Sequence, residues 1–252
     1  VLRVIANRSV GVDHLVLAAA AGRGIIVTNT PDVLSDATAE IAILCMLGAA
    51  RRGAEGDRMV REGRWNTWSP SFMVGAQITG KRFGVLGMGR VGRVTAARAR
   101  GFGMEVHYHN RRPLPPEDAQ GAIWHDTPES LIATSDVLSL HCPATPETEG
   151  IMNAERIAKM PRGAILVNTA RGALVDEAAL VEALKSRHLF AAGLDVFRTE
   201  PGGNPALAAL DNVFLLPHIG SATFETRIAM GYRALDNLDA VFAGNEPVDR
   251  VA

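Results

Sequence analysis

The stretch GVLGMGRVG, residues Gly84 to Gly92, decides how the rest of the chain is interpreted. Two apolar residues lead into three glycines at GxGxxG spacing, and an Arg/Ala-rich segment follows them. Glycine accounts for 25 of the 252 residues, so a match of this kind arises easily by chance. The spacing carries meaning only where it leaves a strand and opens a helix, and the flanking sequence must show that.

Short apolar runs alternate with helical patterns along the chain. The expected strands are Leu2–Ala6, Ile25–Thr28, Arg82–Leu86, Glu105–His109, Val137–His141, Ala164–Asn168, Ala191–Val196 and Val213–Leu216. The expected helices are Val12–Ala21, Asp36–Arg61, Val91–Phe102, Glu129–Ala133, Asn153–Lys159, Asp176–Arg187 and Ser221–Ala243. Short apolar strands that alternate with helices form βαβ units, so the predicted fold class is α/β with a doubly wound parallel sheet covered on both faces.

The segment WNTWSPSFMVGAQITGK, Trp65–Lys81, predicts a domain boundary because Pro, Gly, Ser and two tryptophans interrupt the pattern. We therefore assign residues 74–219 to a nucleotide-binding domain of Rossmann type. Residues 1–73 are assigned to part of a second domain with a linking helix, and residues 220–252 to a C-terminal helix that returns to it. The chain opens on VLRVIAN, a strand already in progress without an initiator Met, so we expect a truncated chain or a fragment.

In this context the glycine stretch predicts a dinucleotide-binding turn. Gly87 permits the tight turn, Gly89 lets the backbone approach a pyrophosphate, and Gly92 allows close packing of helix on strand. The helix N-terminus then offers free N–H groups and the positive end of its dipole to the phosphates. The residues between the glycines complete the predicted phosphate loop: Met88, Arg90 and Val91.

The end of the next strand predicts which dinucleotide binds. NAD binders carry an Asp or Glu there that takes the ribose hydroxyls. This chain has Asn110, Arg111 and Arg112 instead. An arginine pair binds a 2′-phosphate that a carboxylate would repel, so we expect NADPH (NADP) to be preferred, with NADH possible. The alternative is that the two arginines only solvate a loop.

Composition excludes several other classes of function. The formal net charge of −1 argues against a nucleic-acid or anionic-membrane partner. Cys45 and Cys142 form no CxxC pair or ligand cluster, so we expect no disulfide framework, no metal site and a cytoplasmic location. The most apolar run, Ile41–Ala50, is about half a bilayer span and is interpreted as a buried helix.

Four downstream segments, together with the glycine turn, resemble the D-isomer-specific 2-hydroxyacid dehydrogenase family. They are LHCPATPET (Leu140–Thr148), ILVNTARGALVDEAAL (Ile165–Leu180), AGLDVFRTEP (Ala192–Pro201) and LLPHIGSAT (Leu215–Thr223). The resemblance covers essentially the whole chain and is nearest to the glyoxylate/hydroxypyruvate reductase branch, through NRSVGVDH, TNTPDVLSDATAE and RWNTWSP. It implies an oxidoreductase that reduces a small 2-oxo acid to the D-2-hydroxy acid, with an incomplete flavodoxin-like substrate domain beside the nucleotide-binding domain.

The resemblance implies a catalytic trio of Arg171, Glu200 and His218. His218 would be the general acid, because an imidazolium loses its proton near neutral pH. Glu200 would orient the ring and favour its protonated form. Arg171 would bind the substrate carboxylate and polarise the carbonyl. Each residue also has an ordinary structural alternative: a satisfied loop histidine, a solvated turn glutamate and a helix-cap arginine.

The resemblance also implies a set of residues around the cofactor and the substrate. The backbone of Val10 and Gly11 would help to hold the substrate carboxylate, and Asp195 would lie near the nicotinamide carboxamide. Trp68 would reach across a homodimer into the partner's active site. The rest of the implied cofactor cleft, beyond the glycine turn and the arginine tip, consists of His141, Pro143, Thr148, Thr169, Ala170, Arg171, His218 and Gly220.

Family members normally carry several tens of further residues before the strand that matches Leu2–Ala6, so substrate closure is in doubt for this chain alone. Two other hypotheses stay open. One is a dinucleotide-binding dimer without turnover, similar to the corepressor relatives within the family. The other is a formate or phosphite oxidiser, which shares the fold and its arginine.

Overall fold

The protein is described by a computed structural model that covers residues 2–252, and its contacts divide the chain into two compact units. The larger unit is Thr38–Gly220, and the smaller joins the residues up to Ala37 with Ser221–Ala252. The predicted boundary after residue 73 differs from this division. Residues 38–73 group with the larger unit, and the backbone of Cys45 lies so close to Gly193 that no side chain fits between them.

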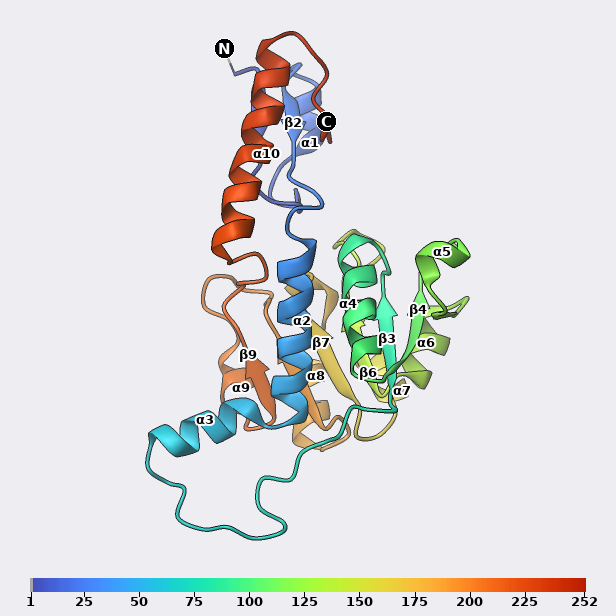
Figure 1. Ribbon diagram of the computed structural model, residues 1–252, viewed down its shortest axis with the longest axis vertical. Coiled ribbons are helices and arrows are strands. Elements are labelled where there is room, and N and C mark those ends of the chain that lie inside the picture. The colour runs from blue at the N-terminus through green and yellow to red at the C-terminus, as the bar shows by residue number, and fades with distance from the viewer. Residues whose placement is uncertain (1) are drawn as a thin grey trace. The chain divides into compact units, whose positions relative to one another are not determined.

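A seven-stranded parallel sheet forms the centre of the larger unit (Figure 1), in the order β5-β4-β3-β6-β7-β8-β9. The strands are β3 (Arg82–Leu86), β4 (Glu105–His109), β5 (Ile123–Trp124), β6 (Val137–Leu140), β7 (Ile165–Asn168), β8 (Ala191–Leu194) and β9 (Val213–Leu215). The predicted doubly wound parallel sheet is confirmed. The two-residue edge strand β5 was not predicted, because two exposed residues carry no alternating pattern.

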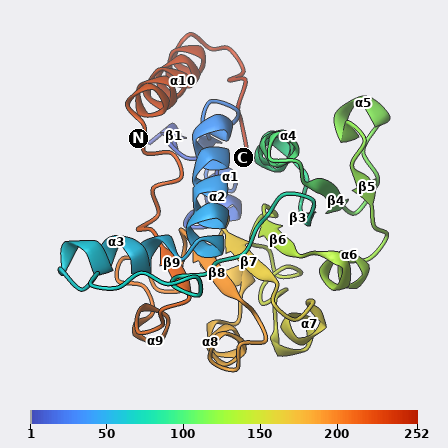
Figure 2. The ribbon, with the colours of Figure 1, turned by 60° about the horizontal axis from the view of Figure 1, so that its bottom comes forward.

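Helices cover both faces of this sheet (Figure 2). One face carries α6 (Pro128–Thr134), α7 (Ala154–Lys159), α8 (Glu177–Lys185) and α9 (Pro205–Ala208). The other carries α2 (Ser35–Ala50), α4 (Arg90–Gly101) and α5 (Pro116–Ala119). Successive strand residues point to opposite faces, so Leu138 belongs to one hydrophobic core and Val137 to the other. A sheet buried on both faces explains why its strands read as continuous apolar runs.

The single helix predicted over Asp36–Arg61 is wrong. The structure has α2, which ends at Ala50, and a separate helix α3 (Gly53–Arg61). Between them Arg52 adopts a left-handed conformation, φ 54°, and its guanidinium pairs with Glu55 at 2.8 Å. A Cβ at Gly53 would lie 3.3 Å from the Gly48 Cα, so glycines at both positions let the chain turn tightly here. The apolar pattern continues across this break, so the sequence pattern did not reveal it.

The smaller unit is built around a two-stranded parallel sheet of β1 (Val4–Ala6) and β2 (Ile26–Thr28). Its helices are α1 (Leu17–Ala21), shorter than predicted, and the long C-terminal α10 (Phe224–Phe242). The Val27 N–H donates to the Ala252 carbonyl at 2.8 Å, so the last residues run along β2. Buried Asp249 accepts from Arg233 at 2.6 Å and from Asn237 at 2.8 Å, which fixes α10 to this segment.

Three findings on absences apply to the described residues 2–252. No helix there is long and apolar enough to cross a membrane. No group of three or more His, Cys, Asp and Glu side chains in that range could hold a metal ion. Cys45 and Cys142 are both free thiols.

Candidate active site

The sequence order of the strands reverses between β3 and β6, and the candidate site lies at the carboxyl ends of these parallel strands and their neighbours. Ligands of open α/β sheets bind at such a switch point, because the connections leave the two strands in opposite directions. Gly87 follows β3 with φ 95°, and a Cβ on it would lie 2.5 Å from the Cys142 nitrogen. A Cβ on Gly92 would lie 2.6 Å from the Gly87 oxygen. Only glycine therefore fits at either end of the turn.

The middle of the turn is open instead of crowded. A Cβ on Gly89 would meet nothing within 4 Å, and α4 begins at the next residue, Arg90. Gly89 is the N-cap of α4 and supplies no side-chain hydrogen bond to the first turn. The first N–H groups of a helix have no intrahelical partner, so this terminus has donors for an anion.

The tip of β4 is fastened to the glycine turn by Asn110. Its side-chain oxygen accepts from the Met88 N–H at 2.7 Å, and its amide donates to the Met88 carbonyl at 3.2 Å. Both polar ends of this side chain are thus used to hold the glycine turn. The next two residues, Arg111 and Arg112, are exposed, and within residues 2–252 neither forms an ion pair with a carboxylate.

The loop after β6 contains His141, Pro143 and Thr148. The His141 Nε2 lies 2.8 Å from the Ser139 hydroxyl, and burial lowers the pKa of His141 to about 4, so this ring is neutral. The Thr148 hydroxyl donates to the Pro143 carbonyl at 2.7 Å and accepts from the Thr145 N–H at 2.8 Å. The Thr148 side chain therefore shapes the loop from within.

The turn after β7 carries Thr169, Ala170 and Arg171, and Asn168 holds it. The Asn168 side chain accepts from the Ala170 N–H at 3.0 Å and donates to the Arg171 carbonyl at 2.9 Å. Arg171 Nη1 donates to the Ala170 carbonyl at 2.7 Å. The Thr169 hydroxyl is buried without a hydrogen-bond partner in the described residues. Sequence reasoning missed Asn168, although it stands inside the quoted ILVNTARG segment.

Asp195 and His218 follow β8 and β9. The His218 N–H donates to the Asp195 carbonyl, and the Ile219 N–H donates to the Asp195 carboxylate, each at 2.8 Å. Burial raises the pKa of Asp195, opposed by the backbone N–H groups of Ile219 and Gly220. Its second carboxylate oxygen is buried beside Gly220 and has no hydrogen bond of good geometry among the described residues.

Glu200 and His218 form a direct pair. The Glu200 Oε2 lies 2.5 Å from the His218 Nδ1, and its Oε1 accepts from the Phe197 N–H at 2.7 Å. His218 has φ 54°, a left-handed conformation that costs free energy for a non-glycine residue and is found at functional sites. The Nδ1 is engaged with a carboxylate, so the opposite ring atom, Nε2, is the one available to a ligand.

The remaining predicted site residues lie outside the strand ends described above, in the smaller unit or in a long loop. Val10 and Gly11 belong to the smaller unit, where Asn29 donates to the Val10 carbonyl at 3.0 Å and Asn7 donates to the Gly11 carbonyl at 2.9 Å. Trp68 is 80% exposed, in the long loop that follows α3 in Figure 1.

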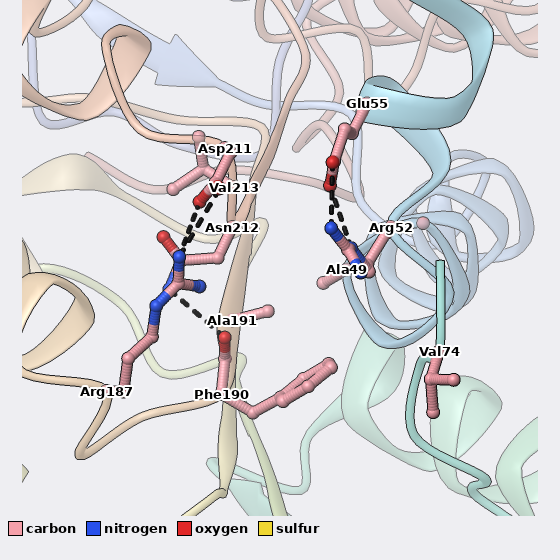
Figure 3. A pocket seen from close by; sticks show the side chains of 11 residues that line it. Ala49, Arg52, Glu55, Val74, Arg187, Phe190, Ala191, Asp211, Asn212 and Val213 are labelled. Carbon is pink, nitrogen blue, oxygen red and sulfur yellow. Dashed lines mark hydrogen bonds and ion pairs between the residues drawn. The ribbon is translucent and has the colours of Figure 1, made fainter. Parts of the chain in front are cut away.

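A separate pocket lies at the amino ends of the parallel strands, opposite the carboxyl ends that form the candidate site (Figure 3). Its walls come from the amino ends of β8 and β9 and from the α2–α3 junction. Two ion pairs flank it, Arg52 with Glu55 and Arg187 with Asp211. None of the predicted site residues lines this pocket, so it is not part of the candidate site.

The carboxyl-end residues fit a nicotinamide dinucleotide. The Gly89 approach is open, the α4 N-terminus offers donors to phosphates, and Thr169 and Asp195 keep buried polar atoms without partners. Buried polar atoms without partners are rare in native structures, and a bound ligand is one way to complete them. Thr28, Thr30 and His107 carry the other such atoms among the described residues, so this feature supports the fit only together with the open glycine turn. A nicotinamide dinucleotide has phosphates that fit the α4 N-terminus and a polar ring that fits the polar atoms of Thr169 and Asp195.

The fold and the site thus define a dinucleotide-binding α/β protein. The profile of the D-isomer specific 2-hydroxyacid dehydrogenase, NAD binding domain, matches residues 43–220. The chain belongs to the D-isomer specific 2-hydroxyacid dehydrogenase family, which confirms the predicted resemblance.

Three relatives illustrate the similarity. A glyoxylate reductase from Pyrococcus furiosus is 45% identical over 251 residues, which cover 98% of this chain and 74% of that protein. A putative D-isomer specific 2-hydroxyacid dehydrogenase from Polaromonas sp. JS6 66 has a crystal structure that matches with a TM-score of 0.95 and 52% identity, over 100% of this chain and 79% of that one. An NADPH-dependent glyoxylate/hydroxypyruvate reductase from Sinorhizobium meliloti, in complex with NADP and malonate, matches with a TM-score of 0.91 and 38% identity, over 100% and 78%.

Proposed function

We propose that the protein reduces a small 2-oxo acid, such as glyoxylate or hydroxypyruvate, to the D-2-hydroxy acid with NADPH. The observation that carries the proposal is the His218–Glu200 pair, 2.5 Å apart, at the same sheet edge as the Arg171 turn. The names of the relatives, glyoxylate reductase and glyoxylate/hydroxypyruvate reductase, support this substrate class.

His218 is proposed as the general acid. Its Nδ1 faces the Glu200 carboxylate, so a proton on that atom is held there and the Nε2 proton is the one given to the carbonyl oxygen. Glu200 stabilises the positive ring before transfer and keeps the ring in one orientation. The Phe197 N–H fixes the other carboxylate oxygen of Glu200, so the acid–carboxylate pair is held before substrate arrives.

Arg171 is proposed to bind the carboxylate of the substrate. A guanidinium fork matches a carboxylate, and its charge also offsets charge that develops on the carbonyl oxygen. The backbone of Val10 and Gly11 is proposed to hold the same carboxylate from the smaller unit. When bound, a reduced nicotinamide supplies the hydride. Asp195, with one carboxylate oxygen open, is proposed to accept from the carboxamide of that ring.

NADPH is proposed as the preferred cofactor and NADH as a possible one. The proposal rests on Arg111 and Arg112, which are both exposed at the end of β4. A hydrogen bond from Thr145 is the main cause that lowers the pKa of the Glu147 carboxyl, and the charge of Arg111 also contributes. Asn110 is occupied with the glycine turn, so the two arginines are the charged groups at this tip. The Sinorhizobium meliloti relative, described as NADPH-dependent, is consistent with this choice.

A homodimer is proposed, with Trp68 reaching the partner's active site. Trp65, Trp68 and Val74 are all more than half exposed within one loop, and apolar groups exposed together mark protein interfaces. Sedimentation of the protein at micromolar concentration tests this, and a stable monomer would contradict it.

The first experiment is NADPH consumption with glyoxylate and with hydroxypyruvate, with NADH in parallel. We expect turnover by the natural sequence and a fall of about a thousandfold or more in His218→Gln, since the proton donor is lost. The matched control is His188→Gln, because the His188 Nε2 lies 3.2 Å from the Ile157 carbonyl and His188 precedes the amino end of β8, whereas His218 follows the carboxyl end of β9.

Equal turnover by both variants and the natural sequence would exclude His218 as the acid. Binding of NADPH without turnover by the natural sequence would instead favour the alternative function, a dinucleotide-binding dimer that does no chemistry.

A further inference from the structure

We propose that Glu177 is a positioning residue for the His218–Glu200 pair: its carboxylate clamps both ends of the loop that carries Glu200. The inference rests on the proposed function, because it assigns Glu177 a part in the same proton transfer. Glu177 opens α8, on a different element from either member of the pair.

The clamp consists of two short hydrogen bonds to one side chain. Glu177 Oε1 accepts from the Arg198 N–H at 2.7 Å, and Oε2 accepts from the Asn204 side-chain amide at 2.7 Å. Glu200 lies between these two anchors in the sequence. A carboxylate that accepts one bond from each side of a loop fixes the separation of the loop ends, and hydrogen bonds to a charged acceptor are the stronger kind.

The Arg198 guanidinium makes further hydrogen bonds to the turn that precedes Glu177. Its Nε donates to the Val175 carbonyl at 3.1 Å and its Nη2 to the Ala173 carbonyl at 3.3 Å. A Cβ at Gly172 would overlap the carbonyl of Phe197, so the two backbones also lie in direct contact. The turn that follows Arg171 and the loop that contains Glu200 are therefore joined into one structure.

The loop needs this support because few bonds of its own hold it. Residues 198–202 are exposed, and within the loop the Gly203 N–H donates to the Thr199 carbonyl at 2.9 Å. Glu200 must nevertheless stay within 2.5 Å of the His218 Nδ1. Small displacements of a catalytic geometry reduce rates strongly, so an anchored loop matters to the reaction.

The test is a double-mutant cycle between Glu177 and Glu200. We expect Glu177→Ala to lower kcat/KM for 2-oxo acid reduction about tenfold, with unchanged NADPH affinity, and Glu200→Gln to lower it more. If Glu177 acts through Glu200, adding Glu177→Ala to Glu200→Gln causes no further fall beyond about twofold. Effects that multiply in full would overturn the proposal.

Two variants guard against a merely structural explanation. Glu182→Ala lies on the same helix, where Glu182 pairs only with exposed Lys185 at 3.1 Å, and should leave kcat/KM unchanged. Glu177→Gln keeps an oxygen that can accept from the Arg198 N–H but loses the charge, so its activity should fall between the natural sequence and Glu177→Ala. A Gln variant as poor as the Ala variant, together with an equal loss of thermal stability, would indicate a structural role.

A readout independent of turnover is the NMR signal of the proton in the His218–Glu200 hydrogen bond, identified by its loss in His218→Gln. A loop that loses its anchor holds Glu200 less firmly, so this signal should weaken in Glu177→Ala as it does in Glu200→Gln. A signal identical to that of the natural sequence contradicts the clamp. If the natural sequence shows no turnover, the proposed reaction fails, yet this signal still decides the clamp.

Discussion

The proposed preference for NADPH rests on Arg111 and Arg112. Replacing both by Ala should lower kcat/KM with NADPH by about tenfold or more per arginine, because each charge-assisted bond to a 2′-phosphate contributes about 1.5–3 kcal/mol. Activity with NADH, which lacks that phosphate, should change little. Steady-state kinetics with both dinucleotides measures the ratio directly.

The control for that pair is Arg162→Ala. Arg162 is also exposed, but it precedes the amino end of β7, at the edge of the sheet away from the glycine turn. It should leave the NADPH to NADH ratio unchanged. If the double variant also keeps the natural ratio, the arginines merely solvate the loop and the preference for NADPH is refuted.

The family resemblance predicted one partnership, Glu200 with His218, but not the hydrogen bonds that hold the surrounding loops. The candidate pair His218 and Glu200 was recognised in quoted motifs, and the structure brings the two side chains together. Asn168 and Glu177 both stand inside the quoted segment Ile165–Leu180. Asn168 holds backbone groups two and three positions away, and Glu177 holds a backbone N–H 21 positions away and a side-chain amide 27 positions away. Such partners depend on how the chain folds, so no local pattern announces them.

Among the elements, α4 contains two glycines with opposite surroundings. Gly92 packs against the phosphate loop, where a Cβ would lie 2.6 Å from the Gly87 oxygen and 3.1 Å from a Val85 methyl group. Gly101 ends the same helix with nothing within 4 Å of a Cβ. Gly92→Ala should lower the free energy of unfolding by about 1–3 kcal/mol through overpacking and should weaken dinucleotide binding.

Gly101→Ala is the matched variant on that helix. It should leave binding unchanged and raise the free energy of unfolding by up to about 0.5–1 kcal/mol, because alanine loses less backbone freedom in a helix than glycine. Urea unfolding and dinucleotide titration of both variants check the pair. Equal stability effects would show that the crowding at Gly92 is not the cause.

Elements were predicted best where burial imposes a pattern. The strands Arg82–Leu86 and Glu105–His109 have their predicted bounds because they lie inside the sheet. The exposed edge strand β5 and the short helix α5 lack that constraint and were not predicted. The break at Arg52 depends on a left-handed residue followed by glycine, a combination that apolar periodicity does not register.

At the scale of the whole molecule, three histidines of the larger unit should make stability depend on pH. Burial lowers the pKa of His141 to about 4 and is also the main cause that lowers the pKa of His107 and of His125. The His107 Nδ1 lies 2.9 Å from the His125 Nε2, a contact that needs at least one of the two nitrogens without a proton. All three rings are therefore neutral in the folded protein near pH 7.

Both positive and negative groups surround the His107–His125 pair, and their effects on the two pKa values oppose one another. Glu105 and Asp136 raise the pKa of His107 and Arg82 lowers it, while Asp126 raises the pKa of His125 and the neighbouring histidine rings, His107 and His109, lower it. The dominant cause for each ring remains burial, which disfavours the charged form.

The sign of the dependence follows from linkage. A histidine whose pKa is lower in the folded state takes up a proton on unfolding when the pH is below its unfolded pKa of about 6.5. The free energy of unfolding is therefore unaffected by this histidine above about pH 6.5 and decreases as the pH falls toward the folded pKa. His141 alone should reduce the free energy of unfolding by about 2 kcal/mol between pH 7 and pH 5. Urea unfolding of the larger unit across this range measures the loss, before most carboxylates titrate. The variant His107→Gln/His125→Gln should show a shallower decline. A stability that stays flat from pH 7 to pH 5 in the natural sequence would contradict the assignment of three neutral rings.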